Sequence, residues 1–490
     1  MGDVPESRLI DRPWLATASW YVAGGLTAWS FGYAAVAAGD LWWHVATGRL
    51  TLEMRAIPLV DSFSYSRKGQ PWLQHEWLSD LIFAVWDRAF GLQALVYWKW
   101  SVIVTAFVLL LAVLRRTTRE PAAAFLGTLA AAAVSANFLD IRPHLYSLVG
   151  FTLLLLLTYD RKRIPLGLPL LFLVWVNLHG GFFFGLMALA VILSTRFVGA
   201  DPDDRRRSLL VGTGCILAAL VNPNGIGSFA YPIRYAFDST SPFREVIAEW
   251  RPPFDPAGIH SPLYPWAIGL FIAAVIFTFA SSAYRRERGV PLAGLALGFL
   301  TLAMSLTSRR FIPLFAISQT LVVVPALGHL LTPLLRRIPS LAQASGALVL
   351  GLVLLIPHPL STRAFAEMTA EAQFPRRACD YADENGISGP VFAYYNWGGY
   401  LHLRTAGRLE VYIDGRADTV FDDETLQRYR QVNAGKPGWL EVIESSGARY
   451  ILWPTAQVKF MLDPLRSSGR WQIRYSDDVA VLFERYDPAG

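Results

Sequence analysis

Asp40-Leu41-Trp42-Trp43-His44 follows residues 14–37, the first long hydrophobic segment of the chain, and decides how the fold is interpreted. An acidic side chain costs roughly 2.5 to 3.5 kcal/mol at the centre of a membrane helix, and the C-terminal end of a helix repels anions. An Asp just beyond a spanning segment therefore needs an explanation. We interpret Asp40 as a catalytic carboxylate at the membrane surface, although an Asp after a Gly can also simply cap a helix that begins at Leu41.

The composition indicates a membrane protein. Hydrophobic residues make up 53% of the 490 residues, and the mean hydropathy is +0.34. Runs such as 151–159 and 166–176 lack the charges that a solvated helix face needs. The net charge of +6 comes from short basic clusters between hydrophobic segments, where the rule for cytoplasmic loops explains them, so nucleic acid is not an expected partner. The only cysteines, Cys215 and Cys379, cannot form a zinc cluster.

Stretches of about 20 apolar residues mark the expected membrane spans. The sequence predicts about eleven of them by this measure, near residues 14–37, 92–114, 121–139, 143–159, 165–179, 181–199, 207–223, 263–282, 291–306, 311–333 and 341–358. Basic clusters lie in alternate loops between these spans, at Arg115-Arg116, Arg161-Lys162-Arg163, Arg205-Arg206-Arg207, Arg285-Arg286 and Arg336-Arg337. Because cytoplasmic loops are enriched in Lys and Arg, we expect these loops and the amino terminus inside the cell.

The expected fold class is a polytopic all-α membrane domain, residues 1–359, followed by a soluble α/β domain, residues 360–490. In the second domain, strand-like runs occur at 391–395, 409–413, 449–453 and 479–483, and helical runs at 366–384 and 423–432. The outer face, periplasmic or extracellular, should carry this domain and the loops 40–91 and 224–262. The loop 40–91 is rich in Trp, which suits helices that lie in the interface of the inner or plasma membrane.

Standard nucleotide and zinc motifs are missing. No G-x-x-x-x-G-K-[ST] occurs, no G-x-G-x-x-G opens a helix, and His75-Glu76 lacks the second His of the zinc motif. What remains is a set of polar residues at the expected outer ends of helices: Asp40, His44, His75, Glu76, Asp80, Asp140, Arg142, His144, Asn177, His179, Glu245, Glu249, Arg309 and Arg310. Such a set suits transfer from a donor whose leaving group is a phosphate, because a carboxylate can take the acceptor proton while cations stabilise the departing charge.

These features together resemble the GT-C superfamily of integral-membrane glycosyltransferases. The resemblance rests on an acid after the first helix, amphipathic helices in the first outer loop, an acid in the second outer turn and an outer C-terminal domain. Asp40 is followed by Leu41 rather than by the second acid common in aminoarabinose and mannosyl transferases. The W-W-D-Y-G motif of oligosaccharyltransferases is also absent, and the nearest stretch is Tyr395-Asn396-Trp397-Gly398-Gly399-Tyr400.

The resemblance implies a polyprenyl-phosphate-linked sugar donor, a glycan, lipid or protein acceptor, contact with membrane lipid, and an inverting transfer. It implies catalytic roles for Asp40 and Asp140, which would also hold a divalent metal such as Mg²⁺ or Mn²⁺ if one takes part. The expected substrate-binding residues are His44, His75, Glu76, Arg142, His144, His179, Glu245, Arg309 and Arg310. Of these, Arg309 and Arg310 are the expected phosphate ligands, since guanidinium suits phosphate.

Plain structural roles are the alternatives for these residues. His44 and His75 can be ordinary interfacial hydrogen-bonding groups, and Glu76 and Asp80 can form a solvated stripe. His179-Gly180-Gly181 can be a tight turn in which Gly supplies the dihedral angles. Glu245 and Glu249 can lie on one exposed helix, and Arg309 and Arg310 can snorkel to the interface. A lipid or solute transporter or flippase, which should have ionisable groups at the bilayer midplane, and a scaffold for envelope assembly are the other functional classes.

Overall fold

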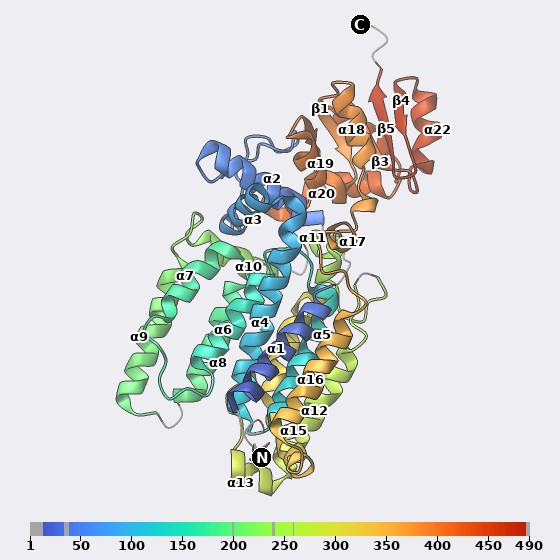
Figure 1. Cartoon of the computed structure of the whole chain (residues 1–490). Coiled ribbons are helices and arrows are strands. Elements are labelled where there is room, and N and C mark those ends of the chain that lie inside the picture. The colour runs from blue at the N-terminus through green and yellow to red at the C-terminus, as the bar shows by residue number, and fades with distance from the viewer. Residues whose placement is uncertain (1–12, 34–38, 198–199, 238–240, 258, 487–490) are drawn as a thin grey trace. The chain divides into compact units, whose positions relative to one another are not determined.

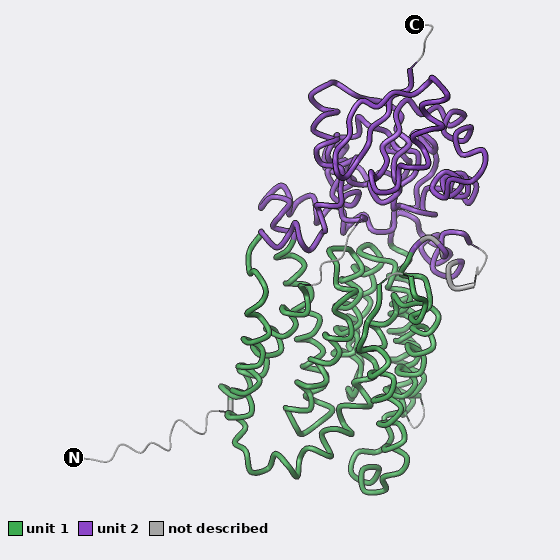
Figure 2. Tube along the Cα trace, turned by 90° about the vertical axis from the view of Figure 1, so that its right-hand side faces the viewer, with its two compact units in different colours: residues 1–34, 96–221, 248–362 green, residues 35–95, 222–247, 363–490 purple. Residues whose placement is uncertain are grey.

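The chain forms two compact units, shown in different colours in Figure 2. The computed structural model describes residues 13–33, 39–197, 200–237, 241–257 and 259–486. Unit 1 comprises residues 1–34, 96–221 and 248–362, and unit 2 comprises residues 35–95, 222–247 and 363–490. The expected first outer loop, 40–91, thus belongs to the same compact unit as the C-terminal segment. The end of the first hydrophobic segment, residues 34–37, lies outside the described residues.

Unit 1 is a bundle of helices (Figure 1). Its helices are α1 Pro13–Phe31, α4 Leu95–Thr117, α5 Pro121–Ser135, α6 Leu145–Thr158, α7 Leu168–Leu178, α8 Phe182–Phe197, α9 Pro202–Ala219, α12 Tyr264–Ala280, α13 Ser282–Arg288, α14 Leu292–Thr307, α15 Ile312–Leu335 and α16 Ser340–Leu355, with Leu95 counted in unit 2. Every segment predicted to span the membrane overlaps one of these helices. Small residues bring these helices close together: added Cβ atoms at Gly150 on α6 and Gly185 on α8 would both overlap the ring of Trp175 on α7.

Within the described residues, three helical segments are long and apolar enough to cross a membrane: Leu92–Thr117, Pro121–Phe138 and Arg309–Leu335. A fourth would be α12 with α13 if this pair, bent by 89°, formed one span. Helices α6, α7, α8, α14 and α16 are apolar but shorter. These helices and the fold indicate an integral membrane protein, whereas the count of about eleven spans stays a prediction.

Several basic clusters of unit 1 lie together. Arg116 Nη2 donates a hydrogen bond to the carbonyl oxygen of Leu156 at 2.9 Å, and Arg196 Nη2 donates one to that of Lys162 at 2.8 Å. Arg207 Nε donates to the carbonyl oxygen of Ile164 at 2.6 Å. The loops that carry 115–116, 161–163 and 205–207 therefore meet at one end of the bundle, as alternate loops should. Which side of the membrane this end faces stays a prediction.

Unit 2 combines helices with a small sheet (Figure 1). Its helices are α2 Gly39–Met54, α3 Trp77–Phe90, α10 Gly227–Phe237, α11 Phe243–Val246, α17 Ala364–Met368, α18 Arg376–Glu384, α19 Gly398–Thr405, α20 Asp423–Asn433, α21 Trp439–Ser445 and α22 Lys459–Ser468. Its strands are β1 Gly389–Ala393, β2 Leu409–Val411, β3 Tyr450–Pro454, β4 Trp471–Ser476 and β5 Ala480–Arg485. The helical run expected at 366–384 is divided, because a 3₁₀ turn at Glu371–Gln373 and Pro375 separate α17 from α18.

The sheet has the strand order β2-β1-β3-β5-β4 and is mixed. β1 pairs in parallel with β2 and β3, whereas β5 runs antiparallel to β3 and β4. All five residues of β3 are buried, as expected for a central strand. β4 was not predicted from the sequence: it is an edge strand whose four central residues are not buried, so it lacks the apolar run that identifies β3.

Candidate functional site

Asp40 lies in the first turn of α2, where the helix dipole favours a negative charge. Helix α2 already includes Gly39, so Asp40 lies inside its first turn. Its side chain is half-buried, and Trp43 Nε1 donates a hydrogen bond to its Oδ1 at 3.4 Å. A Cβ added to Gly415 would overlap the same oxygen. The carboxylate is therefore in contact with a turn that is far away in the sequence but in the same unit.

His44, one turn further along α2, pairs with a buried carboxyl group. Its side chain is 2% exposed, and its Nδ1 lies 2.6 Å from Oδ1 of Asp80. The other oxygen, Oδ2, accepts a hydrogen bond from Gln74 Nε2 at 2.7 Å. Burial, and secondly the charge of Glu76, raise the pKa of Asp80 well above its usual range. His44 and Asp80 thus share a hydrogen bond in which the neutral carboxyl form is favoured.

Glu76 lies beside the same pair. Its Oε2 is 3.8 Å from His44 Nε2, and its Oε1 is 3.9 Å from His75 Nε2. His75 also approaches the carbonyl oxygen of Leu73 through Nδ1, at 3.3 Å. Glu76 is 8% exposed and Asp80 is fully buried, so the alternative of a solvated stripe is wrong. The structure brings His44, Glu76 and Asp80 together around the start of α3.

A buried ionic network supports the turn that contacts Asp40. Arg416 donates from Nε and Nη2 to both oxygens of Asp414, at 2.8 to 3.1 Å, and from Nη1 to Asp61 Oδ1 at 2.5 Å. His402 Nε2 lies 2.9 Å from Asp414 Oδ2. Burial opposes the ionisation of Asp414, but Arg416 outweighs it and holds the pKa of this carboxyl below its usual range. Arg416 thus pairs with Asp414 in the same turn and with Asp61 in the first loop.

Unit 1 contains a second polar cluster around Arg142. Arg142 Nη1 donates a hydrogen bond to Glu249 Oε1 and lies 3.6 Å from Asp140 Oδ2. His144 Nε2 lies 3.5 Å from the other oxygen of Asp140. Burial would raise the pKa of Glu249, but Arg142, and after it Arg310 and His144, outweigh burial and hold that pKa at about 2. Asp140, Arg142, His144 and Glu249 therefore form one charged group at one end of the bundle.

The two neighbouring arginines have different surroundings. Arg309 is fully buried and donates hydrogen bonds to the carbonyl oxygens of Pro252, Asp255 and Ile259, at 2.8 to 3.1 Å. Arg310 is half-buried, with its guanidinium carbon 4.4 Å from the centre of the Trp250 ring. These contacts favour a structural role for Arg309, which holds the loop before α12. That Arg310 binds phosphate stays a prediction.

His179 belongs to a hydrogen-bonded turn between α7 and α8. Trp175 Nε1 donates to Ser147 Oγ at 2.8 Å, and Ser147 Oγ lies 2.6 Å from His179 Nδ1. The backbone N–H of Gly181 donates to the same Nδ1 at 3.0 Å. Because Nδ1 accepts, the ring proton is on Nε2. A Cβ at Gly181 would overlap Ser147 Oγ, and φ is not positive there, so close approach rather than an unusual dihedral requires this glycine.

Two residues show where sequence reasoning fell short. Glu245 lies on α11 in unit 2, is exposed, and pairs with Arg430 Nη2 at 2.8 Å, whereas Glu249 belongs to the Arg142 cluster. The chain turns between them at Ile247, so they do not share one helix. Lys99 was not singled out, yet it is fully buried on α4 and interacts electrostatically with Asp140. A buried cation within an apolar run is the signal that could have identified it.

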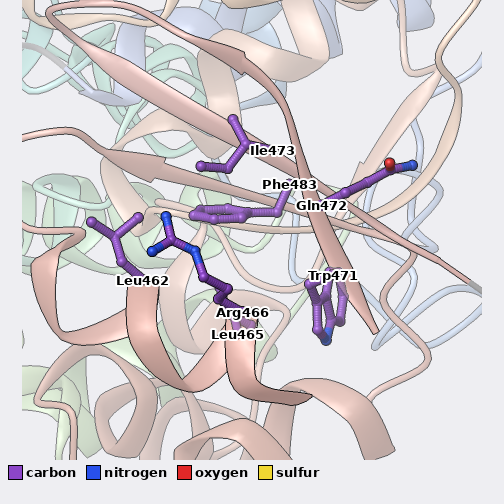
Figure 3. Close-up of a pocket in the computed structure, with 7 residues that line it drawn as sticks. All are labelled: Leu462, Leu465, Arg466, Trp471, Gln472, Ile473 and Phe483. Carbon is purple, nitrogen blue, oxygen red and sulfur yellow. The ribbon is translucent and has the colours of Figure 1, made fainter. Parts of the chain in front are cut away.

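In the described ranges, no group of three or more His, Cys, Asp or Glu could hold a metal ion. Asp40 and Asp140, the expected metal ligands, lie in different units. Figure 3 shows a small pocket between α22 and β4, lined by Leu462, Leu465, Arg466, Trp471, Gln472, Ile473 and Phe483. None of the candidate residues lines it.

Solved structures of two other proteins resemble this chain over most of its length. The archaeal oligosaccharyltransferase AglB from Archaeoglobus fulgidus, in complex with an inhibitory peptide and a dolichol-phosphate, matches with a TM-score of 0.56 and 14% identity, over 90% of this chain and 69% of AglB. ArnT from Cupriavidus metallidurans, bound to undecaprenyl phosphate, matches with a TM-score of 0.51 and 13% identity, over 98% of both chains. No protein-family model and no curated protein matches. The chain has a GT-C-like fold, which confirms the expected resemblance at the level of fold.

Proposed function

We propose that this chain is a membrane glycosyltransferase that moves a sugar or glycan from a polyprenyl-phosphate-linked donor to an acceptor outside the cytoplasm. The observation that carries the proposal is the position of Asp40, half-buried in the first turn of α2 after the first hydrophobic segment, in a chain with a GT-C-like fold. AglB was solved with dolichol-phosphate and ArnT with undecaprenyl phosphate. Both ligands are polyprenyl phosphates, which supports this class of donor.

Asp40 acts as the general base. Its carboxylate accepts the proton of an acceptor hydroxyl while that oxygen forms a bond to the anomeric carbon of the donor sugar. The bond from this carbon to the phosphate oxygen breaks on the opposite face, and its electron pair leaves with the polyprenyl phosphate. The configuration at the anomeric carbon inverts. A general base contributes about 10² to 10⁴-fold in rate.

Fixed cations stabilise the phosphate that departs. We assign this role to Arg310, because its guanidinium lies over Trp250 and is not bound to backbone carbonyls in the way that Arg309 is.

Asp140, with Arg142 and His144 beside it, is the proposed second acidic position. The Nε2–H of His179 is a further proposed donor to substrate. We propose that His44, His75 and Glu76 hold the region around Asp40 in place. Glu245, at the surface, stays a predicted substrate-binding residue.

Replacing Asp40 with Asn tests this function. Asn keeps the size of the side chain and can still accept the hydrogen bond from Trp43 Nε1, so folding should be unaffected while the base is lost. We expect the rate of transfer from a polyprenyl-phosphate sugar to fall by about 10² to 10⁴-fold, with an unchanged melting temperature. A purified Asp40→Asn protein with activity within a few-fold of the wild type would contradict the proposal.

A flux assay distinguishes a glycosyltransferase from a transporter or flippase. Liposomes that contain the purified protein should release product only when donor and acceptor are both present. Movement of the intact lipid-linked sugar across the bilayer, undiminished in Asp40→Asn, would instead support a transporter or flippase.

A further inference from the structure

Gly415 lies directly against the Asp40 carboxylate. A Cβ built on Gly415 would overlap Asp40 Oδ1 and would lie 3.4 Å from Trp43 Nε1. The φ angle of Gly415 is not positive, so its backbone conformation is open to any residue. Glycine is required here only because a side chain would occupy the space that the carboxylate fills.

The turn that contains Gly415 is anchored on both sides. Asp414 and Arg416 are joined by three side-chain hydrogen bonds, two from Nε and one from Nη2, and Arg416 N–H also donates to Asp414 Oδ1 at 3.0 Å. Both side chains are buried, and Arg416 reaches Asp61 in the first loop. Trp72 lies on one side of the guanidinium, with its ring centre 4.8 Å from the guanidinium carbon. Because breaking a buried ion pair is strongly destabilising, we expect the turn that contains Gly415 to keep its position.

The Asp40 side chain is the more adjustable partner in this contact. Its carboxylate is the end of a short side chain with two rotatable bonds, and it is half-buried. If a methyl group were added at position 415, the carboxylate would move and the turn would stay. Trp43 Nε1, which donates to the same Oδ1, would then lose its alignment.

We propose that Gly415 is a positioning residue for Asp40. The absence of a side chain at Gly415 sets the place and orientation of the catalytic carboxylate. This inference rests on the proposed function, because it assumes that Asp40 is the general base. Gly415 itself makes no bond to substrate. Since a misplacement of about 1 Å can cost on the order of 10²-fold in rate, the effect on activity should be far larger than the effect on folding.

Gly415→Ala is the test variant, measured with a polyprenyl-phosphate sugar donor and purified full-length protein. We expect kcat to fall by roughly 10 to 100-fold, with KM for the donor and the melting temperature close to wild type. Gly227→Ala is the neutral control, because its Cβ would be 3.7 Å from Asn224 Cβ in ordinary contact. Gly398→Ala is the control for a structural clash, since its Cβ would lie 3.0 Å from the Asp414 backbone Cα. It should lower the melting temperature.

A second measurement tests the contact without relying on activity. Asp40→Ala removes the carboxylate that a methyl group added at position 415 would meet, so the small stability cost of Gly415→Ala should disappear in that background. The same cost in both backgrounds would overturn the inference. A wild-type kcat in Gly415→Ala, together with an inactive Asp40→Asn, would also overturn the inference. The proposed function would stand in that case. A fully active Asp40→Asn would overturn both together.

Discussion

The pairing of His44 with Asp80 shows how burial decides the protonation of a single residue. Both side chains are almost inaccessible to water. A buried ion pair would cost several kcal/mol for each desolvated ion. A neutral carboxyl group that shares one hydrogen bond with the imidazole, and accepts one from Gln74, avoids this cost. The raised pKa of Asp80 agrees with the neutral form.

Replacing Asp80 with Asn should therefore be tolerated. Asn can donate to His44 and accept from Gln74, whereas Asp80→Ala removes the hydrogen bonds at His44 Nδ1 and Gln74 Nε2 and should lose about 1 to 3 kcal/mol of stability. The folded-state pKa is raised, so the stability contribution of Asp80 is fully present below about pH 4 and declines as the pH rises. The Asn variant should lack this decline, measured as thermal unfolding from about pH 4 to about pH 8. Equal losses in Asn and Ala would mean that Asp80 is ionised.

At the scale of elements, α2 and α3 are joined by a close approach between their backbones. A Cβ at Gly48 on α2 would overlap the backbone oxygen of Asp80 and lie 2.7 Å from Ala84 Cβ on α3. The pairing of His44 with Asp80 depends on this approach, because those residues lie on the same two helices.

Gly48→Ala should force the two helices apart. We expect a loss of about 1 to 3 kcal/mol, as for other overpacked sites. The matched control is Gly346→Ala on α16, where an added Cβ meets nothing within 4 Å. In that exposed position Ala should stabilise the helix by up to about 1 kcal/mol. Chemical denaturation of the two variants measures both effects, and a neutral Gly48→Ala would show that α2 and α3 are not tightly packed.

Sequence reasoning succeeded where a pattern is local. Long apolar runs predicted the helices of unit 1, because stretches of about 20 apolar residues are typical of membrane helices. A strand-like run at 449–453 predicted β3. Contacts between distant segments carry no such signal. Nothing near Asp40 indicates Gly415, and nothing near Asp61 indicates Arg416. Glu245 and Glu249 look equivalent in the sequence, and only the break at Ile247 sends them to different units.

At the scale of the whole molecule, the membrane topology is the expectation on which the proposed function depends. The basic clusters predict that the loop after α15 is inside and that the loop before α12 and the C-terminal segment are outside. The donor and the Asp40 region would then share one side. In the part of the chain that the structure describes, three helical segments are long and apolar enough to span, so the sidedness of the shorter helices must be measured directly.

Cysteine labelling measures that sidedness. Cys215 and Cys379 are buried, and replacing both with Ala gives a background for single cysteines at exposed positions. In intact cells, a membrane-impermeant maleimide should label Lys436→Cys and His260→Cys, whereas Arg337→Cys should react only after the membrane is opened. Arg337 and Lys436 are both exposed, so access to the reagent and not burial decides the result. Labelling of Arg337→Cys in intact cells would reverse the topology and remove the shared outer face that the glycosyl transfer needs.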